Sequence, residues 1–263
     1  MTTEPARSPA ARPRPHPGFA TARALTSDFW YTLVYLPGSE RRSLEGGRRR
    51  VWTTALGRAG VGRAEALAEV DRLFATARAA EARGRTPTIR AQAEAVSRRL
   101  RLRDPLPGVE IGEALDRNLL RRRVRVAPGA RRVLARLADR GIALGLISNV
   151  LYETGEGARA LIERLDLREP FGATYLSSEH PWAKPSPQPF RMILGELGAD
   201  PRRSAHIGDM EWDVLGAQRA GLRSLLFTGL HRFESPRPRI PPKEAHGCVR
   251  VRRWDEVPSR FGP

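Results

Sequence analysis

From residue 127 onward, short apolar runs alternate with segments whose apolar residues recur every three or four positions. Apolar runs of four to six residues bounded by turn residues are typical of buried strands, and the longer spacing is typical of amphipathic helices. The predicted strands are 142–147, 173–176, 205–208, 224–227 and a short edge strand at 248–251. Strands that alternate with helices predict βαβ units and a parallel sheet.

Four helices are predicted between these strands. Pro128 opens the first and Gly141 ends it, because proline suits the first turn of a helix and glycine the residue after the last. The other three are 158–165, a helix through 190–197, and a helix after 213 that ends at Gly221.

The segment before residue 127 has a different pattern. Residues 22–28 predict one more buried strand, but from 36 to 126 the apolar positions follow helical spacing and no strand pattern is found. Three apolar runs lie at 67–77, 89–100 and 111–119, with Gly84 after the first and Thr88 as a candidate N-cap of the second. We therefore expect an all-helical insert of three or four helices.

The predicted fold is α/β, a doubly wound, Rossmann-like parallel sheet with an inserted all-helical cap. The sheet and its helices would use residues 22–35 and 127–263, and the cap would use residues 36–126. Residues 1–21 are rich in Pro and Arg and predict a disordered tail, and residues 232–245 predict a Pro- and Arg-rich loop.

The chain of 263 residues carries a net charge of +17, which raises the question of nucleic-acid binding. Only Lys184 and Lys243 are lysines among the 46 basic residues, and the arginines are spread over every segment. No helix-turn-helix, zinc-finger or aromatic RNA-binding pattern is found, so nucleic acid is not the expected partner. We expect most arginine runs, such as 121–123, to be solvated helix faces, and the expected partner is a small anionic substrate.

Cys248 is the only cysteine, which excludes an internal disulfide and a cysteine metal cluster. No run approaches the roughly 18 apolar residues needed to cross a bilayer, and the N-terminal region has no apolar core of a secretion signal. These features favour a cytoplasmic protein that does not enter a membrane. The sequence leaves the oligomeric state open.

Polar residues recur where the predicted strands end. Asp28 follows the first strand, Ser148-Asn149 the second, Lys184 lies in the loop after the third, and Asp209 and Asp213 follow the fourth. Each could be a helix cap or half of an ion pair. The carboxyl ends of parallel strands face one crevice, however, so their recurrence predicts a single site.

Four segments carry a resemblance to a known family. They are Asp28–Leu33, Ile147–Asn149, Lys184-Pro185 and Gly208–Asp213. In order and spacing they resemble the motifs of the haloacid dehalogenase (HAD) superfamily of hydrolases, with a helical cap inserted after the first motif. The resemblance covers about residues 22–257.

The resemblance implies roles for residues of the first three motifs. Asp28 would be the nucleophile, forming an aspartyl ester that water later cleaves. Ser148 would hold a phosphoryl oxygen, and Lys184 would neutralise charge and hold the nucleophile. Thr32 and Asn149 would also belong to the substrate-binding set. A carboxylate that attacks an anionic substrate needs such nearby cations to screen the repulsion.

The resemblance also implies a Mg²⁺ site. Asp28 and Asp209 would supply carboxylate oxygens, the backbone carbonyl of Trp30 a further ligand, and Asp213 would bind the ion or orient the site. Carboxylates and waters in octahedral geometry are the ligands that Mg²⁺ prefers.

The first motif departs from the family's phosphatases at two positions. Trp30 stands where they have an Asp that acts as general acid and base, and Tyr31 stands where Gly is frequent. The indole N–H of Trp30 does not exchange a proton near neutral pH. We therefore expect slow turnover of alkyl phosphates, whose leaving oxygen needs a proton, and better turnover of aryl or acyl phosphates.

Three functions remain open from the sequence. The first is a Mg²⁺-dependent phosphatase of a small phosphorylated metabolite, which Asp209 and Asp213 favour. The second is a metal-independent 2-haloacid dehalogenase-like enzyme, in which an aromatic residue at position 30 is usual and Asp28 would displace a halide. The third is a catalytically weak binding or regulatory protein. The substrate cannot be named, because the cap sets specificity and carries no recognisable motif.

Overall fold

The computed structural model describes residues 24–230 and 247–260, and the predicted tail and the loop at 232–245 lie outside these ranges. Six parallel strands form the central sheet in the order β5-β4-β1-β6-β7-β8. They are β1 (Ala24–Ser27), β4 (Ala143–Ser148), β5 (Ala173–Leu176), β6 (Ser204–Gly208), β7 (Arg223–Phe227) and β8 (Val249–Val251). The chain moves outward from β1 in both directions, which confirms the predicted doubly wound sheet.

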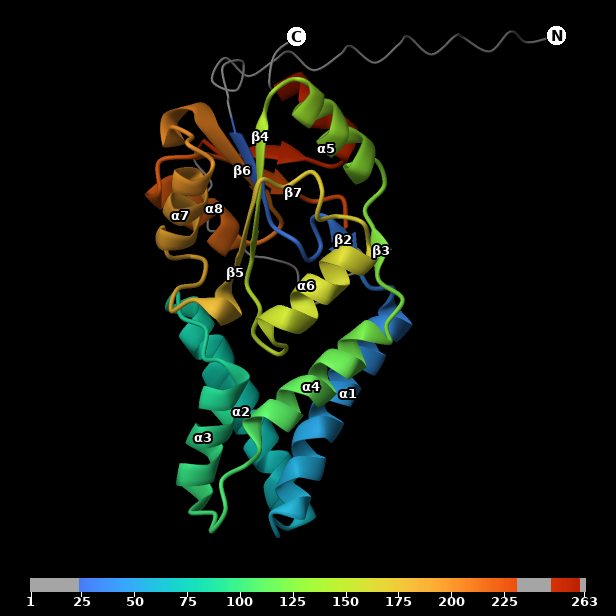
Figure 1. The fold of residues 1–263 in the computed structure, drawn as a ribbon, viewed down its shortest axis with the longest axis vertical. Coiled ribbons are helices and arrows are strands. Elements are labelled where there is room, and N and C mark those ends of the chain that lie inside the picture. Colours follow the sequence, from blue (N-terminus) through green and yellow to red (C-terminus); the bar gives the residue numbers. More distant parts are fainter. Residues whose placement is uncertain (1–23, 231–246, 261–263) are drawn as a thin grey trace, which may run out of the picture.

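Four helices cover the two faces of the sheet (Figure 1). They are α5 (Ala130–Asp139), α6 (Gly155–Arg164), α7 (Gln188–Glu196) and α8 (Glu211–Arg219). Apolar residues of α5 and α6 share a core with β1, β6 and β7 on one face, and those of α7 and α8 share a core with the other face. Short 3₁₀ turns lie at Ser177–Glu179, Pro201–Arg203, Trp254–Glu256 and Pro258–Arg260.

Three predicted helix starts are wrong by two or three residues: α8 begins at Glu211 rather than after Asp213, and the caps explain the other two. The first of these helices begins at Ala130 rather than Pro128, because Gly129 precedes it in the left-handed region with φ of 81°. The second begins at Gly155, three residues before the predicted start, because the Thr154 hydroxyl accepts from the Gly157 amide at 3.0 Å.

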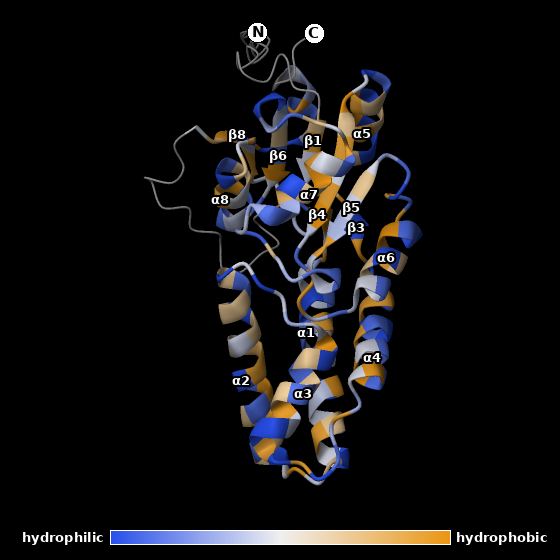
Figure 2. Cartoon of the chain, turned by 60° about the vertical axis from the view of Figure 1, so that its left-hand side comes forward, coloured by the Kyte–Doolittle hydropathy of each residue, from blue (hydrophilic) through white to orange (hydrophobic). Residues whose placement is uncertain are grey.

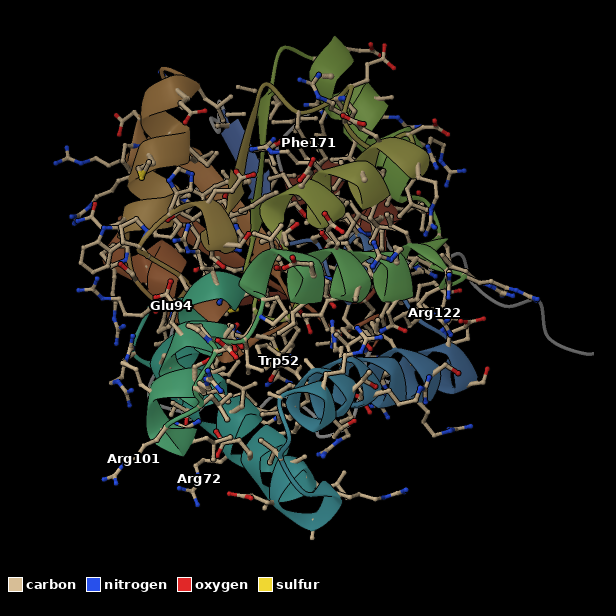
Figure 3. The ribbon with its side chains drawn as sticks, turned by 60° about the horizontal axis from the view of Figure 1, so that its bottom comes forward. Trp52, Arg72, Glu94, Arg101, Arg122 and Phe171 are labelled. Atoms are coloured by element: carbon tan, nitrogen blue, oxygen red, sulfur yellow. The ribbon has the colours of Figure 1, made fainter. Side chains whose placement is uncertain are left out.

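Four helices form the insert, which packs around a hydrophobic core of its own (Figures 1 and 2). They are α1 (Gly38–Arg58), α2 (Arg63–Ala82), α3 (Ile89–Leu100) and α4 (Gly108–Leu120). Trp52 points in among these helices, whereas Arg72 and Arg101 project outward into solvent (Figure 3). The sequence did not predict α1, because its apolar pattern is interrupted. Gly47 is one of the buried residues of this helix and occupies a position where an apolar side chain would be expected.

A two-stranded antiparallel ladder joins the insert to the sheet domain. Its strands are β2 (Val34–Tyr35) and β3 (Arg125–Val126), with Val34 opposite Val126. The prediction that residues 36–126 contain no strand is therefore wrong at residues 125–126. Two residues are too few to show the period of a strand, and only the pairing creates this one.

Within residues 24–230 and 247–260, no helix combines the length and the apolar content needed to cross a lipid bilayer.

Candidate active site

The loop after β1 holds Asp28 in a fixed position at the carboxyl edge of the sheet. The Asp28 amide donates to the Ile207 carbonyl of β6 at 2.9 Å, and the Phe29 carbonyl accepts from the amides of Leu33 and Val34 at 3.0 Å each. Tyr31 lies in the left-handed region with φ of 55°, where glycine is the residue with no steric cost. This is the position at which the family resemblance led us to expect Gly.

Trp254 supports the same loop from the far end of the chain. Its buried indole Nε1 donates to the Thr32 carbonyl at 2.9 Å. The Thr32 hydroxyl lies 3.3 Å from Asp28 Oδ2 and 3.4 Å from Asp209 Oδ1, so it sits between two carboxylates from neighbouring strand ends. The predicted substrate ligand Thr32 is thus fully buried and contacts the carboxylates directly.

Three buried carboxylates meet at this point. Asp28, Asp209 and Asp213 each offer an oxygen, and the three oxygens lie within 4.8 Å of one another. All three side chains are at least nine-tenths buried. Hard carboxylate oxygens gathered at this spacing are the donor set that suits Mg²⁺, so the residues present fit the ion that the family resemblance implies.

Lys184 lies between two of these carboxylates. Its Nζ donates to Asp28 Oδ1, to Asp213 Oδ1 at 2.6 Å and to the Ile147 carbonyl at 3.0 Å. Burial alone would lower the pKa of Lys184, but Asp213 and Asp28 outweigh it and raise that pKa, so the ammonium stays charged. Burial raises the pKa of Asp28 to about 7 even though Lys184 opposes the change. A bound divalent cation would act in the same direction as Lys184, because it favours the ionised form of Asp28.

Asp213 has protein donors on both of its oxygens. Oδ1 accepts from Lys184 and lies 3.1 Å from His206 Nε2, while Oδ2 accepts from the Met210 amide at 2.9 Å. Burial would raise the pKa of Asp213, but Lys184 and His206 lower it to about 2. Of the two predicted roles for Asp213, this geometry favours orienting the site over binding the ion.

His206 belongs to this network, although sequence reasoning did not select it. Its Nδ1 lies 2.9 Å from the Thr26 hydroxyl and its Nε2 faces Asp213. Burial lowers the pKa of His206, so the neutral ring can donate from Nε2 to the ionised Asp213. The only signal in the sequence is a histidine inside an apolar strand, which does not by itself reveal its partner.

The structure separates the two residues of the second motif. The Asn149 amide accepts from the Lys184 backbone N–H at 2.9 Å and donates to the Lys184 carbonyl at 3.0 Å, so it holds the Lys184 loop. Ser148 is buried and lines a separate cavity of about 10 Å³ beside Phe29 and Trp30. Its contact with a phosphoryl oxygen stays a prediction.

A cavity of about 350 Å³ opens in front of the carboxylates, between the sheet domain and the insert. The sheet domain contributes Asp28, Trp30, Tyr31, Asn149, Leu151, Tyr152, Glu153, Lys184, Asp209, Met210, Trp212 and Asp213, and the insert with its leading loop contributes Leu36, Arg41, Leu44, Glu45, Arg48 and Glu81. Its volume suits a small metabolite. The nucleophile candidate therefore faces a cavity with both cationic and anionic groups on its walls.

The family of the chain follows from a comparison of its sequence with models of known families. A model described as haloacid dehalogenase-like hydrolase matches residues 21–221. The chain belongs to the haloacid dehalogenase-like hydrolases. The match includes the ends of β1, β4 and β6 and the loop of Lys184, so it spans every motif of the candidate site.

Two relatives of this HAD chain are phosphatases by name. A phosphoglycolate phosphatase of Rhodospirillum rubrum is 39% identical over 98 residues, which are 37% of this chain and 39% of the relative. A phosphoserine phosphatase of Thermus thermophilus is 35% identical over 128 residues, which are 48% of this chain and 49% of the relative. The chain therefore spans less than half the length of either relative.

Solved HAD structures share the whole fold. A HAD phosphatase from Thermococcus onnurineus has a TM-score of 0.59 at 17% identity, covering 91% of this chain and 98% of its own. A 2-haloacid dehalogenase from Pseudomonas syringae also has a TM-score of 0.59, at 19% identity, with 91% and 98% covered. Because a phosphatase and a dehalogenase share this fold, the reaction has to be argued from the site.

Proposed function

We propose that this HAD hydrolase is a Mg²⁺-dependent phosphatase that acts on a small phosphorylated metabolite through an aspartyl-phosphate intermediate on Asp28. The observation that carries the proposal is the pair of Asp28 and Asp209, on neighbouring strand ends with Thr32 between them. Nucleophilic attack at carbon needs one carboxylate, whereas a second carboxylate beside it favours a metal-assisted reaction at phosphorus.

The residues of the chain have distinct tasks in this reaction. Asp28 attacks phosphorus, and Lys184 fixes the attacking carboxylate and reduces its repulsion toward the phosphate. Asp213 holds the side chain of Lys184 in place, and Asn149 holds its backbone. When bound by Asp28, Asp209 and the Trp30 carbonyl, Mg²⁺ would supply positive charge at the phosphoryl oxygens.

The names of the relatives support phosphate esters as the substrate class. The phosphatase of Rhodospirillum rubrum is named for phosphoglycolate and that of Thermus thermophilus for phosphoserine, and both of these compounds are small anionic phosphate esters. A cavity of about 350 Å³ with Arg41 and Arg48 on its wall fits a compound of that size and charge.

The test compares substrates, metal and two variants. Phosphorylated metabolites and 2-haloacids are screened with and without Mg²⁺, and Mg²⁺ binding is measured by calorimetry. We expect phosphate release that requires Mg²⁺, is abolished in Asp28→Asn, and is accompanied by loss of Mg²⁺ binding in Asp209→Ala. Halide release without Mg²⁺ would contradict the proposal in favour of dehalogenation. Equal Mg²⁺ binding by the wild type and Asp209→Ala would contradict the metal site.

A further inference from the structure

Hydrolysis of an alkyl phosphate needs a proton donor for the leaving oxygen, and Trp30 cannot be that donor. Among the described residues, the cavity wall holds three glutamates outside the carboxylate cluster, namely Glu45, Glu81 and Glu153. Each is therefore a candidate donor, and their surroundings differ.

Two of the three are paired with arginines. Glu153 accepts from Arg48 Nε at 2.7 Å, and Glu45 lies 3.3 Å from Arg41 Nη1 with about half of its side chain exposed. Among the described residues, Glu81 forms no ion pair within 4.0 Å. Glu81 is therefore the one of the three whose carboxyl group is not held in an ion pair.

Glu81 lies at the end of α2, where the insert meets the sheet domain, and it is partly buried. Its Oε1 accepts from Asn149 Nδ2 at 3.0 Å, and Asn149 is itself fixed by both backbone groups of Lys184. No hydrogen bond from the described residues reaches Oε2. A proton on Glu81 would therefore reside on Oε2, while Oε1 fixes the carboxyl group relative to Lys184.

We propose that Glu81 is the general acid and base of this enzyme, serving the leaving group and the hydrolytic water in place of a carboxyl group at position 30. The proposal rests on the phosphatase function proposed above. Burial raises the pKa of Glu81 against the opposing hydrogen bond from Asn149, and this direction favours a carboxyl group that can donate a proton.

Each of the two chemical steps transfers one proton through Glu81. In the first, an Asp28 oxygen bonds to phosphorus, the bond from phosphorus to the ester oxygen breaks, and that oxygen takes the Glu81 proton and leaves as an alcohol. In the second, water bonds to phosphorus and gives a proton to the Glu81 carboxylate, and the bond from phosphorus to Asp28 breaks. Inorganic phosphate leaves, with Asp28 ionised and Glu81 protonated again.

The test uses Glu81→Gln, because glutamine keeps an oxygen that can accept from Asn149 but has no carboxyl proton. Turnover with Mg²⁺ is measured for an alkyl phosphate, such as glycerol phosphate, and for p-nitrophenyl phosphate, whose leaving group needs no proton. In a single turnover, we expect release of the alcohol to slow by about 10²–10⁴-fold and release of p-nitrophenol to slow by less than about 10-fold, whereas steady-state kcat should fall for both substrates because hydrolysis of the aspartyl phosphate also needs the Glu81 carboxylate as base.

A control and a rescue separate catalysis from structure. Glu45→Gln removes another carboxyl group from the cavity wall and should leave the ratio of alkyl to aryl turnover unchanged. Trp30→Asp in the Glu81→Gln background should restore alkyl turnover, since it returns a carboxyl group beside the nucleophile.

The failures of the two proposals can be told apart. Equal slowing of single-turnover leaving-group release from both substrates in Glu81→Gln, or no slowing with either, would overturn the role of Glu81 while leaving the phosphatase intact. Absence of Mg²⁺-dependent phosphate release by the wild type, from any phosphorylated metabolite in the screen, would overturn the phosphatase itself.

Discussion

Lys184 is a buried cation whose charge is balanced by two buried carboxylates. Its side chain is 2% exposed, and Asp28 and Asp213 are its ionic partners. A charge taken out of water is costly unless it is paired and hydrogen-bonded. The same contacts that would position the nucleophile therefore also determine whether this part of the protein is stable.

We expect Lys184→Met to lower the free energy of unfolding by about 3–5 kcal/mol, because it leaves two buried carboxylates without their shared cation. Urea denaturation of the metal-free protein measures this change. As a control, the double variant Lys184→Met with Asp213→Asn should recover part of the loss, since one uncompensated charge is removed as well. A loss below about 1 kcal/mol in the single variant would contradict this account of the ion pairs.

At the scale of elements, the insert depends on a close approach between α1 and α4. A Cβ atom added at Gly47 would lie 2.0 Å from Asn118 Oδ1 and 2.4 Å from Asn118 Cγ. Asn118 cannot easily move away, because its Nδ2 donates to the Leu44 carbonyl at 3.0 Å. Glycine at position 47 is thus required by packing, although glycine weakens the interior of a helix.

The matched pair Gly47→Ala and Gly57→Ala tests this, because both residues lie in α1. Nothing lies within 4 Å of a Cβ atom added at Gly57, so alanine there should stabilise the protein by about 0.5–1 kcal/mol through helix propensity. Gly47→Ala should instead destabilise it by about 1–3 kcal/mol through overpacking. Thermal unfolding of both variants measures the difference, and stabilisation by Gly47→Ala would rule out the close packing.

At the scale of the whole molecule, the insert forms part of the cavity wall and contacts the loop that carries Lys184. The Gly84 carbonyl accepts a hydrogen bond at 2.9 Å from the amide of Ala183, the residue before Lys184. Arg48 Nη2 of α1 lies 2.5 Å from Glu153 Oε1 of the sheet domain. The insert has a hydrophobic core of its own, but Leu44 of α1 and Leu119 of α4 pack in the core of the sheet domain. We expect the insert to move as a lid about this apolar contact, because the polar contacts at Gly84 and Arg48 can break and reform without disturbing either core.

We expect amide hydrogen exchange in residues 40–125 to slow when Mg²⁺ and orthovanadate, a phosphate analogue, are added together, because a closed lid shields its contacts with the sheet domain. Mass spectrometry of the exchanged peptides measures the effect. Helix α5 lies at the end of the sheet domain away from the insert (Figure 1) and serves as the internal control that should not change. Unchanged exchange throughout the insert would indicate that it has a different task.

The sequence by itself determined the features that depend on local pattern. Apolar runs and turn residues identified β1, β4, β5, β6, β7 and β8 to within a few residues. Because parallel strands end at one edge of the sheet, the chain order of Asp28, Lys184, Asp209 and Asp213 was enough to predict that these residues meet. The structure brings all four together.

Only the tertiary structure decided the features that depend on residues far apart in the chain. Glu81 contacts Asn149 across 68 positions, and Trp254 reaches Thr32 across 222, so no local pattern could reveal either pair. The same holds for the ladder of β2 and β3, whose two residues become strands only by pairing, and for Gly47, whose meaning depends on Asn118 in another helix. The spacing of residues along a chain predicts which face of a helix or strand each residue occupies. The residue that it contacts on that face is determined only when separate elements pack together.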